Sequence, residues 1–233
     1  MALETKRGSI EGDTMTRAAE LMARLNPTNI RYDIGRGGLP ELTAQDVAAA
    51  VAMVAPGLGR ELMLRLWWPE GAQLTAKDLD RLLMEAQLAE WRDKADALVT
   101  AQLRLEMADG SSARYRAERE LEDSRAAMWP QLGGESRYAL IREAVLAEMS
   151  AAHRCSACQG RGLVIIEAKL GVCGACAGQG RIQVSDRSRA AAIETDVANY
   201  ARRWRRVYEW TLSLCMDVIE PARREFERRL SRG

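Results

Sequence analysis

The sequence predicts a mainly α-helical protein with a small β-hairpin insert that holds four cysteines, and with a C-terminal helix-turn-helix. Three observations lead to this prediction. Apolar residues recur at the helical period along most of the chain after Leu42. Segments typical of strands are nearly confined to 163–166 and 181–184. Two copies of C-x-x-C-x-G-x-G begin at Cys155 and at Cys173.

Length and composition place the chain among ordinary globular proteins. It has 233 residues, of which 47% are hydrophobic and 29% charged, enough for one large or two small domains with a buried core. No stretch is apolar over the roughly 18 residues that a membrane-spanning helix needs, and the first residues lack the apolar segment of a secretory signal. We therefore expect a cytoplasmic protein without membrane contacts.

The order of these elements suggests four segments. Residues 1–40 are expected to form a weakly structured N-terminal arm, in which Ala18, Leu21, Met22 and Leu25 have helical spacing. Residues 41–152 are expected to form a helical body, 153–184 a zinc-binding insert, and 185–233 a helix-turn-helix region with a C-terminal helix.

Capping and breaking residues set the helix limits within the body. Thr43 is a suitable N-cap for a helix that Pro56 ends, and Thr75 is a suitable N-cap for a long helix. Asp109-Gly110 is expected to turn the chain into the next helix. The expected helices span 44–55, 59–68, 76–108, 113–129 and 135–152, and Pro221 is expected to bend the chain into a separate segment at 222–230.

The cysteine pattern predicts a structural metal site. Cys155, Cys158, Cys173 and Cys176 follow C-x2-C-x14-C-x2-C, a spacing that lets four thiolates bind one Zn²⁺. Two glycines follow each pair at the same offset, and such knuckles need backbone with positive φ; they are Gly160, Gly162, Gly178 and Gly180. Four thiolates close the coordination shell, which argues against a catalytic zinc. A redox dithiol would need one exposed pair rather than two matched pairs.

The remaining candidates for chemistry are few. His153 is the only histidine and is expected at the surface, and Cys215 lies in an apolar helical pattern typical of a core thiol. There is no H-E-x-x-H, nucleophile elbow or phosphate loop, and the carboxylates alternate with arginines as on solvated helix faces. We therefore expect neither an enzyme nor a site for a small-molecule substrate.

Charge is unevenly distributed along the chain. The net charge is only +1, but residues 1–152 carry 19 Lys and Arg against 24 Asp and Glu, whereas residues 153–206 carry 10 against 4. Residues 207–233 carry 5 of each sign. A basic block around the cysteines and the following helices indicates an anionic partner.

The stretch after the cysteines has the pattern of a helix-turn-helix. A short Ala-rich helix is followed by a break at 194–196 and a longer helix. One face of the longer helix is expected to pack inward through Tyr200, Trp204, Val207, Thr211 and Leu214. Base contacts in duplex DNA are expected from Asn199, Arg202, Arg203 and Arg206, and phosphate contacts from Arg187, Arg189 and Arg205. The alternative is a solvated charged face on a structural helix.

Three places in the chain resemble the lambda-type Q late-gene antiterminators of temperate phages. They are the doublet CSACQGRG and CGACAGQGRI, the segment LTAQDVAAAVAMVAPGLGRELML, and the arginine-bearing helix that begins near Trp204 and continues past Cys215. The doublet also occurs in heat-shock co-chaperones, but these usually carry four copies and an H-P-D tripeptide that is missing here. The similar places cover about half of the chain.

The resemblance implies a transcription antitermination factor that works in a bacterial host cell. Such a protein binds duplex DNA at a late promoter, loads onto paused RNA polymerase, and then suppresses pausing and termination. By this analogy the helix of Arg202–Arg206 reads the DNA and the zinc site supports it. Two alternatives stay open: a zinc-containing helix-turn-helix regulator of transcription initiation, and a chaperone-like zinc module, which the basic block disfavours.

Overall fold

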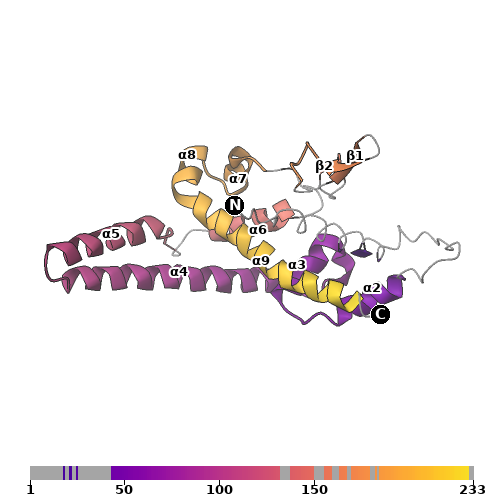
Figure 1. Ribbon diagram of the computed structural model, residues 1–233, viewed down its shortest axis with the longest axis horizontal. Helices are drawn as coiled ribbons and strands as arrows, with labels where there is room; N and C mark the ends of the chain where they lie inside the picture. Colours follow the sequence, from indigo (N-terminus) through magenta and orange to yellow (C-terminus); the bar gives the residue numbers. More distant parts are fainter. Residues whose placement is uncertain are drawn as a thin grey trace, which may run out of the picture. The chain divides into compact units, whose positions relative to one another are not determined.

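The structure is a computed structural model that describes residues 18, 21–22, 25, 43–131, 137–149, 155–158, 163–166, 169–178, 182 and 184–230. These residues are mainly helical, as the sequence predicts (Figure 1). The chain divides into two compact units. Unit 1 comprises Met1–Leu74, Leu146–Val184 and Leu214–Gly233, and unit 2 comprises Thr75–Val145 and Ser185–Ser213. None of the described helices is both long enough and apolar enough to cross a membrane.

The two units do not follow the order of the chain. The residues predicted as one helical body contribute to both units, and so do those predicted as the helix-turn-helix region. The division of the chain into four segments therefore stays a prediction. Of the predicted N-terminal arm, Ala18, Leu21 and Met22 are helical and buried, and Leu25 is half-buried. The rest of residues 1–40 lies outside the described residues.

Residues 43–71 of unit 1 contain two short helices and a 3-10 turn. Helix α2 (Ala44–Ala52) starts where predicted, because Thr43 and Asp46 form a capping box: the Thr43 hydroxyl accepts from the Asp46 amide, and the Asp46 carboxylate accepts from the Thr43 amide. Helix α3 (Leu58–Trp67) follows, then the 3-10 turn η2 (Pro69–Gly71). The described part of α2 buries Val47, Ala50 and Val51 in the core of this unit.

A buried carboxylate holds the chain as it leaves α3. Glu61 is 4% exposed, and its Oε2 accepts hydrogen bonds from the backbone amides of Gln73 at 2.9 Å and of Leu74 at 3.0 Å. Arg65 donates to the carbonyl of Leu74. A buried carboxylate is stable in a protein when it receives such bonds, so Glu61 has a structural role here.

Helix α9 (Arg205–Leu230) runs through Pro221 without ending, so residues 222–230 continue the same helix beyond the predicted bend. Proline removes one helical hydrogen bond, which by itself favours a break. On both sides of Pro221, however, α9 buries apolar side chains, namely Ile219, Ala222 and Phe226. Burial of this stripe favours one continuous helix.

Helices α3 and α9 approach each other closely within unit 1. A Cβ atom added to Gly59 would lie 2.0 Å from the carbonyl oxygen of Val218 and 3.6 Å from the Cβ of Ala222. Only glycine permits this backbone approach. The contact sets the position of α3 against the C-terminal part of α9.

Unit 2 is built on a helical hairpin. Helix α4 (Ala76–Glu106) begins at the predicted cap Thr75, whose hydroxyl accepts from the Asp78 amide. The chain then turns at Gly110, with φ of +81°, into α5 (Ser111–Ala127), which packs along α4 (Figure 1). The small residues Ala101 and Ala117 are buried in the hairpin together with Leu121.

A buried polar network joins three helices of unit 2. Helix α6 (Arg137–Met149) supplies Arg142, which is 5% exposed and binds Asp80 through Nε at 2.6 Å and through Nη2 at 3.1 Å. Its Nη1 donates to Gln87 Oε1 at 2.9 Å. Gln87 in turn donates to the hydroxyl of Thr211 in α9 at 2.8 Å. The network fixes α4, α6 and the start of α9 to one another.

Aromatic rings fill the space beside this network. Trp204 lies edge-on to Tyr138 with ring centroids 5.4 Å apart, and Trp129 lies edge-on to Trp210 at 5.0 Å. Pro130 accepts two hydrogen bonds at its carbonyl oxygen, from the Trp91 indole at 3.0 Å and from the Tyr138 hydroxyl at 2.6 Å. These contacts hold the segment that follows α5.

Two short strands lie between the cysteine pairs. Strand β1 (Leu163–Ile166) pairs antiparallel with β2 (Lys169–Val172), with Leu163 opposite Val172. The predicted strand at 163–166 is thus present. At 181–184, where the sequence also has a strand-like pattern, Ile182 and Val184 are not in a strand, and residues 181 and 183 lie outside the described residues. Strand β1 pairs with β2, which begins at Lys169, three positions after the end of β1, since hairpins join segments that are adjacent in the sequence.

Candidate functional site

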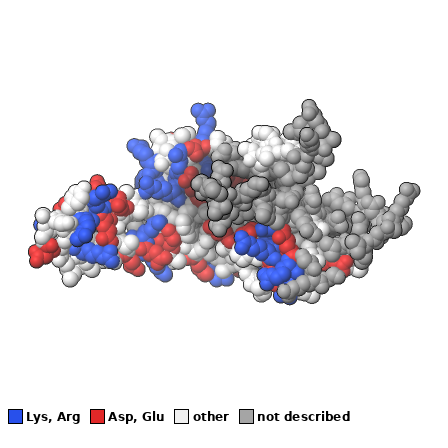
Figure 2. Space-filling view, in the orientation of Figure 1, with Lys and Arg blue, Asp and Glu red and all other residues white. Residues whose placement is uncertain are grey.

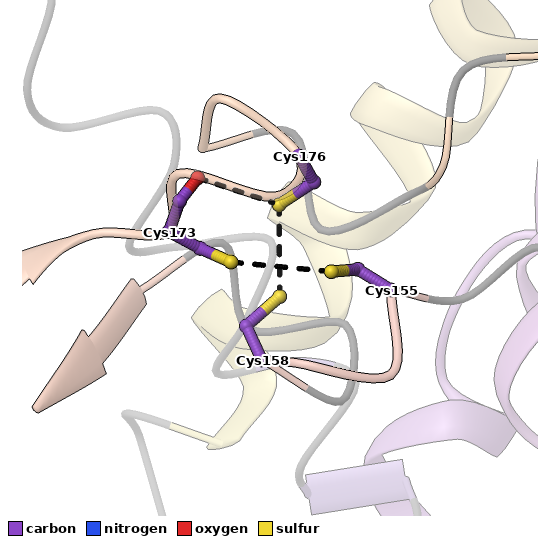
Figure 3. A group of neighbouring side chains, drawn as sticks. All are labelled: Cys155, Cys158, Cys173 and Cys176. Atoms are coloured by element: carbon purple, nitrogen blue, oxygen red, sulfur yellow. Dashed lines mark hydrogen bonds between the residues drawn. The ribbon is translucent and has the colours of Figure 1, made fainter.

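The four predicted metal-ligating cysteines lie together in unit 1. Cys155 and Cys158 are in the turn before β1, and Cys173 and Cys176 are in the turn after β2. Their Sγ atoms all lie within 4.8 Å of one another, with 3.9 Å from Cys155 to Cys173 and 3.7 Å from Cys158 to Cys176. Figure 3 shows all four sulfurs pointing toward one common centre.

The second cysteine turn has the backbone that the predicted glycines provide. Ala177 and Gly178 have φ of +50° and +85°, and the Gly178 amide donates to the carbonyl of Cys173 at 3.3 Å. A Cβ on Gly178 would lie 3.1 Å from Val172 Cγ1, closer than most side-chain contacts. Glycine is therefore required here for both conformation and space. Gly160, Gly162, Gly180 and His153 lie outside the described residues.

The backbone around the first pair favours a thiolate. Hydrogen bonds from the backbone amide of Cys158 and then from that of Ala157 lower the pKa of Cys155 to about 7, although desolvation raises it. A thiolate is the form that binds metal ions. This turn is thus arranged to present at least one sulfur in its metal-binding form.

The geometry of the cluster fits one tetrahedrally bound metal ion. With metal–sulfur distances of about 2.3 Å, a tetrahedral zinc–thiolate site has sulfurs about 3.8 Å apart. The observed separations of 3.7 and 3.9 Å match this value and are too long for disulfides, and all four thiols are free. The sulfurs are buried, and Val164 packs against them. These residues can bind a metal ion with a closed coordination shell.

Cys215 stands apart from the cluster, as predicted. It lies in α9, is buried among apolar residues, and burial raises its pKa to about 12. Such a thiol stays protonated and does not bind metals or react at neutral pH. It is a core residue.

The predicted break at 194–196 lies between two helices of unit 2. Helix α7 (Asp186–Ala192) is closed by backbone hydrogen bonds from Glu194 to Ala191 and from Thr195 to Ala190. Glu194 has φ of +54°, which is unusual for a residue other than glycine. Helix α8 (Val197–Asn199) then starts and continues through the π-helical turn η4 (Tyr200–Trp204) into α9.

The inward face of this helix is confirmed. Tyr200, Trp204, Val207 and Thr211 are all fully buried, and Leu214 is half-buried. Helix α7 packs against α8 and η4, and Trp204 of η4 also packs against Tyr138 of α6. DNA binding by this pair of helices depends on whether their arginines are exposed and without partners.

Four of the six predicted DNA-binding arginines are exposed, and three of these four have no partner among the described residues. Arg187 in α7 and Arg202 and Arg203 in η4 make no hydrogen bond or ion pair with any residue that the structure describes. Figure 2 shows basic side chains gathered over α7 and α8. We call these three residues the free arginines.

The other predicted DNA contacts are engaged within unit 2. Arg205 forms an ion pair with Asp186, and the guanidinium of Arg189 lies 5.0 Å from the centroid of the Tyr208 ring. The remaining two are also bonded: Arg206 donates to the carbonyl of Ala126, and the Asn199 amide donates to the Thr195 hydroxyl at 2.8 Å. These contacts hold α7, α5 and the start of α9 together.

The predicted spacing of the DNA-binding face needs a correction at η4. Positions 199, 202, 203 and 206 share a face only in a continuous α-helix, and η4 replaces one α-helical turn by a wider π-helical turn. Sequence reasoning did not anticipate this turn. It also missed Asp186, Thr195 and Tyr208 as the partners that hold three of the basic-face residues, although an acidic first-turn residue on the shorter helix was a usable signal.

Comparisons of the chain with protein-family models, curated proteins and solved structures gave no match.

Proposed function

We propose that this protein binds duplex DNA through the free arginines and acts as a transcription antitermination factor of the Q type. One observation carries the DNA-binding part: Arg187, Arg202 and Arg203 are exposed on neighbouring helices without partners among the described residues. Exposed guanidiniums on the helices to either side of a tight turn suit phosphate and base-edge contacts. The location of two of them in a π-helical turn supports the same reading, because such turns are frequent at functional sites.

Contacts between α7 and the start of α9 hold the free arginines on a rigid surface. Side-chain ordering opposes binding, and a preformed surface reduces this loss. Asp186–Arg205 and Arg189–Tyr208 fix α7 to the helix that carries Arg202 and Arg203. The face can therefore bind DNA as one body.

The cysteine cluster would hold Zn²⁺ in a structural role. Four thiolates are the donor set that zinc takes in closed sites, and the sulfur separations fit its bond length. The site offers no open position for a substrate, so the cluster contributes folding energy rather than chemistry. The antitermination part of the proposal is based on the sequence resemblance, and it implies RNA polymerase as the second partner.

The test combines DNA binding with transcription. Arg203→Ala is expected to weaken binding to late-promoter DNA by about 1–3 kcal/mol, as for the loss of a base-edge contact. Arg119→Ala, which changes an exposed arginine of α5 in the same unit, is the matched control and is expected to bind normally. Affinity is measured by fluorescence anisotropy with labelled duplexes of promoter and scrambled sequence. Wild-type affinity in Arg203→Ala would contradict the DNA-binding role.

A run-off assay on a terminator-containing template separates the functions. Read-through that depends on both the protein and its own late promoter supports antitermination. Promoter-specific binding with unchanged termination would instead indicate a regulator of initiation. A protein that neither binds nor gives read-through would leave the arginines as a solvated face.

A further inference from the structure

One long side of α4 is not covered by the rest of its hairpin. Helix α5 packs on the side of α4 that carries Ala101, and Ala97 lines the groove between the two helices. A two-residue step in an α-helix turns the direction of the side chain by about 200°. Val99, two residues after Ala97, and Leu103, two residues after Ala101, therefore point away from α5. Each is 53% exposed.

Two exposed charges frame this apolar pair. Arg92 and Glu106 lie seven residues before and seven residues after Val99, and a seven-residue step returns to within about 20° of the same helix face. Both side chains are exposed, and neither forms an ion pair with another residue in the described part of the chain. At 1.5 Å per residue, each lies about 10 Å along the helix from Val99.

This arrangement is complementary to itself when reversed. If a second copy of α4 lies antiparallel with Val99 on the two-fold axis, each residue n positions after Val99 faces the residue n positions before it. Arg92 then faces Glu106 of the second copy, and Leu103 faces Ala95 of the second copy. A parallel pairing in register would instead place Arg92 against Arg92, which is repulsive.

We propose that this face of α4 binds a second copy of the same chain as an antiparallel, two-fold symmetric dimer. Such isologous contacts use the same patch on both copies, and the four residues Arg92, Val99, Leu103 and Glu106 form a patch of that kind. The apolar part is small, so the dimer is reversible and depends on the two ion pairs for orientation. The proposal is independent of DNA binding.

The test uses charge reversal and complementation in the full-length protein. Sedimentation equilibrium between about 1 and 300 μM measures the dimer dissociation constant, a range that covers weak association. Arg92→Glu alone and Glu106→Arg alone each create two like-charge contacts and are expected to raise this constant about tenfold or more. An equimolar mixture of the two variants restores both ion pairs and is expected to dimerise like the wild type.

Controls separate the pairing from effects on folding. Both side chains are exposed and pair with no residue in the described part of the chain, so the single variants are expected to keep wild-type circular dichroism and melting temperature. Arg116→Glu, a reversal of the same sign on α5, is expected to leave the dimer unchanged. A wild-type protein that is monomeric at every concentration would overturn the proposal. A dimer whose dissociation constant is unchanged by Arg92→Glu would overturn it too. The same holds for a mixture of the two variants that dimerises no better than either variant alone, because each outcome excludes this antiparallel contact.

Discussion

Cysteine residues in this chain have two different surroundings. Backbone amides of Cys158 and Ala157 donate to the Cys155 sulfur and lower its pKa to about 7, whereas burial raises the pKa of Cys215 to about 12. Both outcomes were predictable from spacing. A two-residue gap with trailing glycines predicts a metal-binding turn, and a cysteine within an apolar helical pattern predicts a core residue.

Cys158→Ser is expected to remove bound metal from the protein. Three thiolates and a hydroxyl bind Zn²⁺ far more weakly than four thiolates, and the binding energy of a structural metal is also folding energy. Metal content by atomic absorption should fall from one ion per chain to near zero, with loss of order around β1 and β2 in amide exchange. Cys215→Ala is the matched control and is expected to keep the metal. Full metal content in Cys158→Ser would show that the cluster is not the site.

At the scale of single residues on the basic face, the sequence predicted the candidates but not their partners. Arg187 and Arg205 look equivalent in the sequence, yet one is free and the other is paired with Asp186. Pairing depends on how α7 lies against α9, and this arrangement is tertiary. The sequence shows that Asp186 lies in the first turn of α7, but not which arginine it faces.

The helix ends show which local sequence signals are strong enough to determine where a helix begins or ends. Thr43 and Thr75 were predicted as N-caps and both act as such, because capping is a contact within one turn. Pro221 was predicted to bend the chain, yet α9 continues through it, because the packing of Ile219 and Phe226 on either side favours one helix. The second strand was misplaced for a similar reason: strand pairing depends on what lies opposite rather than on propensity.

The contact between α3 and α9 gives a prediction at the scale of elements. Gly59→Ala would place a Cβ 2.0 Å from the Val218 carbonyl, so the helices must separate. We expect the free energy of unfolding to fall by about 1–3 kcal/mol through overpacking, even though alanine favours a helix by about 1 kcal/mol over glycine. Urea denaturation followed by circular dichroism measures the change.

Gly174→Ala is the matched control for this prediction. Gly174 is exposed in the turn after β2, its φ lies outside the positive range that favours glycine, and nothing lies within 4 Å of its added Cβ. We expect the free energy of unfolding of this variant to change by less than about 0.5 kcal/mol, as for surface substitutions. If Gly59→Ala proved more stable than the wild type, helix propensity would outweigh the contact and the close approach would not position α3.

Over the whole molecule, charge is nearly balanced while its distribution is not. A net charge of +1 gives no long-range attraction to DNA, so binding must come from the local basic block. The sequence predicted six arginines in that block as DNA contacts, and the structure leaves three of them free: Arg187, Arg202 and Arg203. The number of arginines that contact phosphates therefore distinguishes the sequence-based prediction of six from the three that are free in the structure.

The salt dependence of DNA binding measures that number. For duplex DNA, the logarithm of the binding constant falls against the logarithm of salt concentration with a slope of about −0.9 per neutralised phosphate. Three free arginines predict a slope of about −2.7, and all six would give about −5.4. Anisotropy titrations of this protein with non-specific duplex DNA between about 50 and 200 mM salt measure the slope. A slope of about −5.4 would mean that all six arginines contact phosphates. The contacts Arg189–Tyr208, Arg205–Asp186 and Arg206–Ala126 would then exist only in the free protein and break on DNA binding.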